Sequence, residues 1–268
     1  MSNPTYQHPD QLRIDAKVAP QMLRTPRKRS WMRKLSLGIG AFLLVATSTT
    51  LVAGAVAKAH LRANYPPIGQ LVDIGSYRLH LSCQGTGSPS VILEAGGGET
   101  GLDWTLVAPA IAKQARVCVY DRAGLGWSES QPPAAHRDGD GRGTAHPPRA
   151  RDFGGPYVLV GHSIGGMINR QYAVAGPHDV VGMVLVDSAS EQQSARFPEA
   201  IDASLAGAPR MLRLLSLAGD AGLLVLFPGI FPPTPQLPAD VATTVQVLYI
   251  SSGKIFRTSL AEMRTRSE

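Results

Sequence analysis

Ser163 is the residue whose type and setting most clearly indicate chemistry. It is the central residue of Gly161-His162-Ser163-Ile164-Gly165, and the apolar residues 157–160 precede it. A serine on a sharp turn between a strand and a helix carries its Oγ clear of the sheet, and small neighbours avoid clashes in such a turn. The pattern therefore predicts that Ser163 is a nucleophile at the start of a helix.

The elements that would position this serine alternate along the chain. Residues 91–95, 115–121, 157–160 and 181–187 are β-type runs separated by segments long enough for a loop and a helix. That alternation is typical of a parallel α/β sheet. We expect a mostly parallel sheet flanked by helices, with residues 77–83 as a further strand.

From about residue 69 to residue 188 the chain resembles the α/β-hydrolase fold family, in the form that uses a serine nucleophile. Three segments carry the resemblance in the family's order: residues 91–98, 117–128 and 155–163. The resemblance implies hydrolysis of a carboxylic ester or a related acyl substrate. It also implies that the backbone N–H groups of Gly97 and Ile164 form an oxyanion hole, worth about 3 to 4 kcal/mol per donor in such sites.

An acid and a base to assist Ser163 are harder to find. Asp187 ends the strand over residues 181–187 and is the candidate acid, with a structural carboxylate as the alternative. His178 follows Ser163 but is expected in a loop at the opposite edge of the sheet. His80 lies within a strand, and His162 is inside the turn itself. Without a base, a serine hydroxyl is a weak nucleophile.

Residues 191–268 resemble the start of the family's helical cap, with an amphipathic piece at 208–217 and a proline-rich turn at 228–238. The resemblance leads us to expect that the fold is truncated before its last strands. Residues 135–151 are rich in His, Arg, Asp, Gly and Pro where the family carries a helix. Paired frameshifts would explain this run, and a solvated loop insert is the alternative.

The N-terminal part of the chain has the composition of a membrane anchor. Residues 1–34 carry eight Lys/Arg and two Asp/Glu, a net charge of +6 that equals the total of the whole chain. Residues 35–57 follow without a charge and are long enough to cross a bilayer. We expect a disordered cytoplasmic tail at 1–34, a transmembrane helix at 35–57 and an extracytoplasmic hydrolase core at 66–190. Signal cleavage and secretion is the alternative.

The remaining patterns argue against nucleic acid, metal and cofactor binding, and they leave open whether the two cysteines form a disulfide. Because the excess basic charge precedes the apolar segment, it gives no sign of a nucleic-acid surface. No Cys or His pair has metal-ligand spacing, so no metal and no cofactor are expected. Cys83 and Cys118 fall on strands expected to be neighbours, where they form either a disulfide or two buried thiols.

Two other functions compete with the serine hydrolase. The first is a membrane-anchored remnant or binding module that keeps the pocket without a catalytic triad. The second is dinucleotide binding, since residues 96–101 fit Gly-x-Gly-x-x-Gly after a strand and Asp121 follows about twenty residues later. The dinucleotide alternative leaves the segment around Ser163 unexplained.

Overall fold

The computed structural model describes residues 28–132, 155–175, 178–193, 196–199, 201 and 205–265. Contacts divide the chain into two units, Met1–Ala46 and Thr47–Glu268, and each is described by itself. Residues 1–27 of the expected tail and the run at 135–151 lie outside the described residues.

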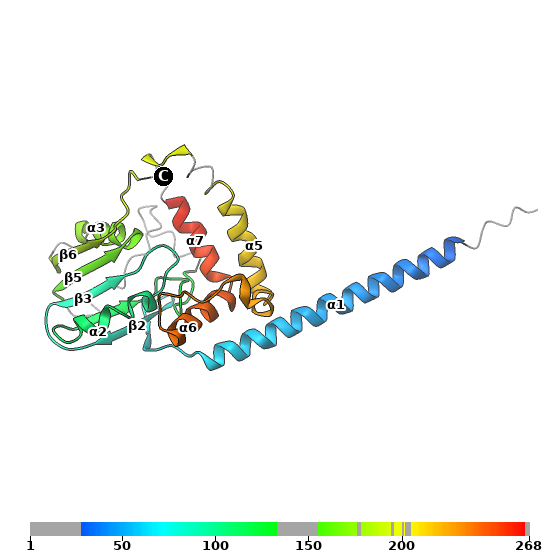
Figure 1. Ribbon diagram of the computed structural model, residues 1–268, viewed down its shortest axis with the longest axis horizontal. Coiled ribbons are helices and arrows are strands. Elements are labelled where there is room, and N and C mark those ends of the chain that lie inside the picture. Colours follow the sequence, from blue (N-terminus) through cyan, green and yellow to red (C-terminus); the bar gives the residue numbers. More distant parts are fainter. Residues whose placement is uncertain are drawn as a thin grey trace, which may run out of the picture. The chain divides into compact units, whose positions relative to one another are not determined.

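A six-stranded sheet forms the centre of the second unit (Figure 1). The strands are β1 (Gln70–Asp73), β2 (Arg78–Gln84), β3 (Ser90–Glu94), β4 (Val117–Tyr120), β5 (Tyr157–His162) and β6 (Val180–Val186). Their order across the sheet is β1-β2-β4-β3-β5-β6. β4, β3, β5 and β6 run parallel, and β1 and β2 add an antiparallel edge. The α/β-hydrolase fold expected from the sequence is confirmed.

The central strands β3 and β5 are buried on both faces, and successive side chains along each strand point to opposite faces of the sheet. On one face, Ile92 and Leu159 join a cluster that also contains Tyr172 of α3 (Ile164–Ala175). On the other face, Leu93 and Val160 pack with residues of η1 (Gly101–Trp104) and α2 (Ala108–Ile111). Helices therefore pack on both faces of β3 and β5, with α3 on one face and η1 and α2 on the other.

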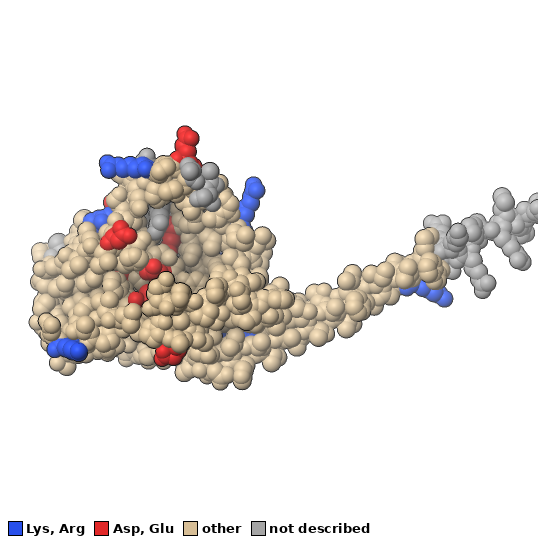
Figure 2. Space-filling view, viewed as in Figure 1, with Lys and Arg blue, Asp and Glu red and all other residues tan. Residues whose placement is uncertain are grey.

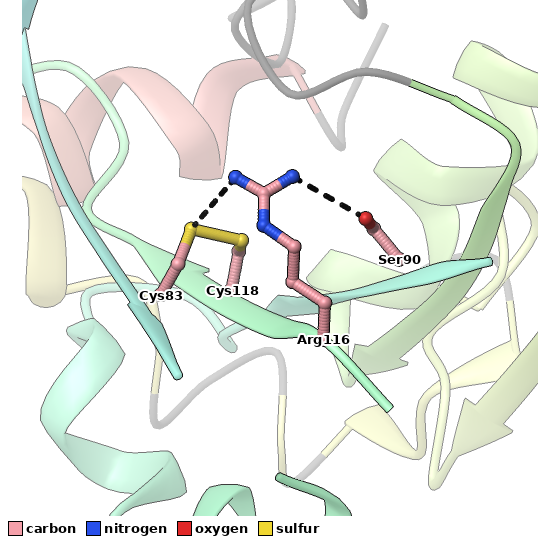
Figure 3. Close-up of a disulfide and its surroundings, with 4 residues drawn as sticks. All are labelled: Cys83, Ser90, Arg116 and Cys118. Carbon is pink, nitrogen blue, oxygen red and sulfur yellow. Dashed lines mark hydrogen bonds between the residues drawn. A yellow bond between two sulfur atoms is a disulfide. The ribbon is translucent and has the colours of Figure 1, made fainter. Parts of the chain in front are cut away.

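A disulfide joins the antiparallel part of the sheet to the parallel part. Cys83 and Cys118 are directly paired on β2 and β4, and they form the bond seen in Figure 3. The Arg116 guanidinium lies beside it, 3.8 Å from Cys83 Sγ and 3.4 Å from Ser90 Oγ. The structure therefore selects the disulfide from the two alternatives left by the sequence.

The segment after β6 is helical, as expected for residues 208–217. It contains α5 (Ala208–Asp220), η5 (Leu224–Leu226), η6 (Pro228–Ile230), α6 (Ala239–Ile250) and α7 (Lys254–Thr265). Leu224, Ile255 and Phe256 form a further buried cluster with Leu125 from the segment after β4. These helices gather beyond the carboxyl ends of the parallel strands (Figure 1), where active sites of open α/β sheets lie.

The N-terminal apolar segment forms one helix, α1 (Lys28–Asn64). Trp31–Asn64 is long and apolar enough to cross a membrane, a test that an N-terminal signal sequence also passes. Figure 2 shows its surface as almost uncharged, with basic side chains near its start. The last turns of α1 belong to the second unit: Gly54 is buried against Gly222, and Lys58 Nζ donates to Asp220 O at 2.9 Å.

Candidate active site

Ser163 lies in the sharp turn predicted from the sequence, between the end of β5 and the start of α3. Its φ is 52°, in the left-handed region that a residue with a Cβ rarely adopts. Ser163 N donates to Val186 O at 3.1 Å, and Ala189 N donates to Ser163 O at 2.9 Å. Backbone bonds to the segment around the end of β6 therefore hold the unfavourable conformation, which is the kind of strain found at functional sites.

The glycines two residues on either side of Ser163 are sterically required. A Cβ on Gly161 would lie 2.5 Å from Gly166 N, and one on Gly165 would lie 2.6 Å from Glu94 O. The second clash also shows that the first turn of α3 packs directly against the end of β3. The two chain segments that would supply oxyanion donors therefore meet at one edge of the sheet.

The loop after β3 presents one unpaired donor between two paired ones. Gly96 N donates to Glu99 Oε2 at 2.6 Å, and Gly98 N donates to Glu262 Oε2 at 3.1 Å. Gly97 lies between them, is exposed, and its N–H has no acceptor among the described residues. Ile164 N opens α3, where the first N–H groups have no partner within the helix. These are the two donors expected from the sequence.

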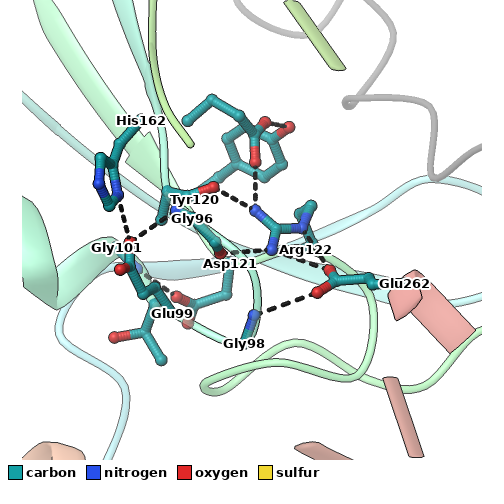
Figure 4. Close-up of polar contacts among 12 residues, drawn as sticks. Gly96, Gly98, Glu99, Gly101, Tyr120, Asp121, Arg122, His162 and Glu262 are labelled. Carbon is teal, nitrogen blue, oxygen red and sulfur yellow. Dashed lines mark hydrogen bonds and ion pairs between the residues drawn. The ribbon is translucent and has the colours of Figure 1, made fainter. Parts of the chain in front are cut away.

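The last two helices also contact this loop, and Figure 4 shows the contact made by Glu262 of α7. Tyr249 on α6 donates its hydroxyl to Gly98 O at 2.8 Å, while Glu262 on α7 accepts from Gly98 N. Gly98 has a φ of 72°, and a Cβ there would lie 3.0 Å from Ser259 Oγ. The position next to Gly97 is thus fixed through its N–H, its carbonyl and its conformation.

A buried ion-pair network centred on Arg122 contacts the same loop (Figure 4). Arg122 Nη1 donates to Glu94 Oε1 at 2.7 Å and to Ala95 O at 2.6 Å, and its Nη2 donates to Gly96 O at 2.7 Å. Its Nε donates to Glu262 Oε1 at 2.9 Å. One guanidinium therefore connects the end of β3, the loop that follows it and α7.

Glu94 is an unusual residue for the centre of this sheet, since its carboxyl is almost fully buried. Burial raises the pKa of Glu94 to about 7, against the opposing effect of the positive charge of Arg122. The Tyr120 hydroxyl donates to its other oxygen. Burial lowers the pKa of Arg122, but the carboxylates of Glu262 and Glu94 outweigh it and raise that pKa above its usual value.

A pair formed by a histidine and a carboxylate lies beside the candidate nucleophile. His162 Nδ1 is 3.0 Å from Glu99 Oε2, the oxygen that also accepts from Gly96 N. Both side chains are about one-third exposed. Glu99 thus connects the residue preceding Ser163 to the loop that carries Gly97 (Figure 4).

Asp121 is a structural carboxylate. It is buried, accepts from Gly101 N at 2.8 Å and Trp127 N at 2.9 Å, and lies 2.9 Å from His80 Nδ1. Burial acts to raise the pKa of Asp121, but the adjacent His80 and the hydrogen bonds from these backbone groups lower it below its usual value. The carboxyl that the dinucleotide alternative needs for a ribose is therefore already used inside the protein.

Asp187 and His178, the two residues after Ser163 that were considered as acid and base, lie at opposite ends of β6. Asp187 follows Val186 at the end of β6, on the same edge of the sheet as Ser163, and is exposed with a φ of 42°. His178 lies in the turn before β6, at the opposite end of that strand. Among the described residues, no histidine side chain hydrogen-bonds to Ser163 or Asp187. The described residues also contain no group of three or more side chains that could hold a metal ion.

Sequence reasoning missed the residues that hold the loop. Glu94 carried a usable signal, because a charged residue inside a buried apolar strand requires a buried partner. Tyr249 and Glu262 carried none, since they lie more than 150 residues from the loop and on helices without a motif.

Comparisons with known proteins agree with the fold. The alpha/beta hydrolase fold family matches residues 89–218. A Hormonema carpetanum protein assigned as the transporter efuK is 34% identical over 137 residues, which is 48% of this chain and 20% of that protein. The Yersinia enterocolitica protein assigned as the carbamate hydrolase RutD is 31% identical over 113 residues, 41% of each chain.

The fold is also found among solved structures. A Pseudomonas aeruginosa protein assigned as an epoxide hydrolase superposes with a TM-score of 0.56 at 16% identity, over 74% of this chain and 69% of that one. The chain spans less than half the length of the curated relatives named above. The structure therefore has the alpha/beta hydrolase fold, and the match to that family covers just under half of the chain.

Proposed function

We propose that this protein is a serine hydrolase acting on carboxylic esters or a related acyl substrate, with Ser163 as the nucleophile. The observation that carries the proposal is the strained Ser163 at the start of α3, with the unpaired N–H of Gly97 on the adjoining loop. A tight turn of this kind is the setting in which α/β-hydrolases expose a serine hydroxyl.

The reaction would proceed by acyl transfer. Ser163 Oγ attacks the acyl carbon and loses its proton to a base, and the N–H groups of Gly97 and Ile164 stabilise the oxyanion of the tetrahedral intermediate. Collapse of that intermediate breaks the bond to the alcohol, which leaves with a proton. Water then attacks the acyl-serine and releases the acid. Asp187 is the candidate acid that would orient the base.

The relatives support an acyl substrate. RutD is assigned as a carbamate hydrolase, and Mycobacterium tuberculosis LipV, 44% identical over 52 residues, is named a lipase. Carbamates and carboxylic esters both contain a carbonyl that passes through a tetrahedral oxyanion. An oxyanion hole of two backbone N–H groups serves either substrate.

Hydrolysis of p-nitrophenyl acetate and p-nitrophenyl butyrate by the purified full-length chain tests the proposal. Ser163→Ala should lower kcat/KM at least about 100-fold, whereas Ser190→Ala, on an exposed serine close to the site, should leave it unchanged. Equal rates for the wild type and Ser163→Ala would contradict the proposal.

One observation favours a second candidate, a non-catalytic binding module. The described residues contain no histidine side chain bonded to Ser163, so the proton acceptor that a serine nucleophile needs is not seen there. This candidate predicts that ester analogues bind without turnover. Ser163→Ala would then leave binding of the analogue unchanged.

We also propose that α1 anchors the protein in a membrane with residues 1–34 in the cytoplasm. Basic residues before an apolar helix favour that orientation. The disulfide between Cys83 and Cys118 suits an oxidising compartment outside the cytoplasm. Because Gly54 and Lys58 contact the hydrolase domain, the spanning part would end before Gly54.

Protease treatment of intact cells tests this orientation. The hydrolase domain should be digested while an N-terminal tag is protected. Digestion of the tag with protection of the domain would contradict the proposed orientation, and release of a shortened soluble domain would indicate signal cleavage.

A further inference from the structure

A cavity lies apart from the candidate active site. It has a volume of about 350 Å³, is open on one side, and is lined by the end of α1, the segment 126–130 after β4 and the corner between α6 and α7. All of these elements belong to the unit Thr47–Glu268. Ser163, Gly97 and Ile164 do not line it, so the proposed ester chemistry leaves this cavity unexplained.

Two cationic side chains line the cavity from different elements. Arg62 is in the last turn of α1, and Lys254 opens α7. Lys254 Nζ donates to Ser128 O at 2.7 Å, which uses one of its three N–H donors. The side chain of Arg62 makes no hydrogen bond or ion pair with the described residues. Most of the donors on these two cations therefore lack an acceptor in the described part of the chain.

The acidic groups near these cations are already paired elsewhere. Glu129 also lines the cavity, but its Oε1 accepts from Arg78 Nε and Nη2, and its Oε2 accepts from Arg78 N. Asp121 lies behind the cavity wall and is occupied by His80 and two backbone N–H groups. Neither carboxylate hydrogen-bonds to the side chain of Arg62 or Lys254, so donors of both cations remain available to a bound anion.

The rest of the lining combines hydroxyls with apolar surface. Ser251 and Ser252 are buried at the turn before α7, and Ser252 Oγ accepts from Lys254 N at 3.2 Å. The start of α7 adds the positive end of a twelve-residue helix. Tyr65, Pro67, Val247 and Leu248 supply apolar walls. Hydrogen-bond donors therefore cluster at Ser251, Ser252 and the start of α7. The apolar walls can contact the organic part of a ligand.

The charge state of Lys254 agrees with this picture. Burial, with a contribution from the charge of Arg62, lowers the pKa of Lys254 to about 8, although Asp121 and Glu129 act to raise it. The charged form of the Lys254 amine is therefore less stable here than in water, and a nearby negative charge would stabilise it. A bound anion would supply that charge.

We propose that this cavity is a binding site for the phosphate group of an anionic ester, held between Arg62 and Lys254. The phosphate would accept from the guanidinium, the ammonium and the Ser251 hydroxyl, and the organic part of the ester would lie on Tyr65 and Leu248. The site is independent of hydrolysis at Ser163. The same chemistry is presented by a phospholipid headgroup and by a free phosphate.

Thermal unfolding of the full-length chain in neutral detergent at pH 7 tests the site, with ionic strength held constant. The three probes are inorganic phosphate, dihexanoyl phosphatidylglycerol and dihexanoyl phosphatidylcholine, the last being a zwitterionic match for the second. A ligand that binds the folded state raises the unfolding midpoint saturably. We expect such a rise with the phosphatidylglycerol and none with the phosphatidylcholine.

The comparison of probes identifies the source of the phosphate. A phosphatidylglycerol affinity at least tenfold above that of inorganic phosphate supports a lipid headgroup, and the reverse order supports a free phosphate. No saturable rise with either anion overturns the proposal. An equal rise with phosphatidylcholine overturns it as well.

Matched variants assign the effect to the cavity. Arg62→Gln and Lys254→Met should each weaken anion binding at least tenfold, whereas Lys113→Met and Arg210→Gln, on exposed side chains elsewhere, should not. Equal anion affinity in all four variants would overturn the proposal. If Lys254→Met does not fold, Arg62→Gln decides, because the side chain of Arg62 is exposed.

Discussion

Glu262 Oε2 accepts a hydrogen bond from the backbone N–H of Gly98 at 3.1 Å, so α7 fixes the loop that carries the candidate oxyanion donor Gly97. Tyr249 of α6 binds the carbonyl of the same residue. The helices after β6 are therefore part of the machinery that shapes the candidate active site, in addition to covering the ends of the strands.

We expect Tyr249→Phe to lower the rate of acylation at Ser163 about tenfold, because Gly98 loses a hydrogen bond and Gly97 becomes less well oriented for the oxyanion. The free energy of unfolding should change by only about 1 kcal/mol, as for one ordinary hydrogen bond. Stopped-flow measurement of p-nitrophenyl acetate acylation checks this. Tyr77→Phe is the matched control, and an equal loss of rate in that variant would show that the effect is not specific to the loop.

Glu94 should make stability depend on pH. Its pKa is raised by burial from 4.5 to about 7, so the folded state holds this proton more tightly than the unfolded state. The stabilisation is complete below pH 4.5 and is lost as the pH rises through 7, a change of about 3 kcal/mol at most.

Denaturant unfolding of the wild type and Glu94→Gln from pH 4.5 to pH 8 checks this prediction. The wild type should lose stability relative to the variant as the pH rises. Parallel pH profiles for the two proteins would show that Glu94 does not titrate in this range.

The disulfide should stabilise the sheet. Cys83 and Cys118 are 35 residues apart in sequence. Closing a loop of that size lowers the entropy of the unfolded chain, which stabilises the folded state by about 3 to 4 kcal/mol. The double variant Cys83→Ala, Cys118→Ala should unfold at correspondingly lower denaturant concentration. Titration of thiols in the denatured wild type should find none, and two reactive thiols would contradict the bond.

The order of elements and the position of the nucleophile were predictable because they depend on local patterns. Apolar runs identified the parallel strands, and Gly161 and Gly165 identified the turn around Ser163. The short strand β1 was missed, because residues 70–73 offer only two apolar side chains and depend on pairing with β2.

The contacts that support the site were not predictable because they join distant parts of the chain. Arg122 pairs with Glu94 and Glu262 across separations of 28 and 140 residues, and only the fold brings them together. The pairing of His162 with Glu99 likewise depends on two adjacent strand ends.

Covalent labelling by a fluorophosphonate, located by peptide mass spectrometry, tests whether Ser163 is the nucleophile. We expect the folded full-length chain to be labelled on Ser163, Ser163→Ala to remain unlabelled, and Ser190→Ala to be labelled like the wild type. A folded wild-type chain that takes up no label, or takes it up on another residue, would contradict the assignment of Ser163 as the nucleophile.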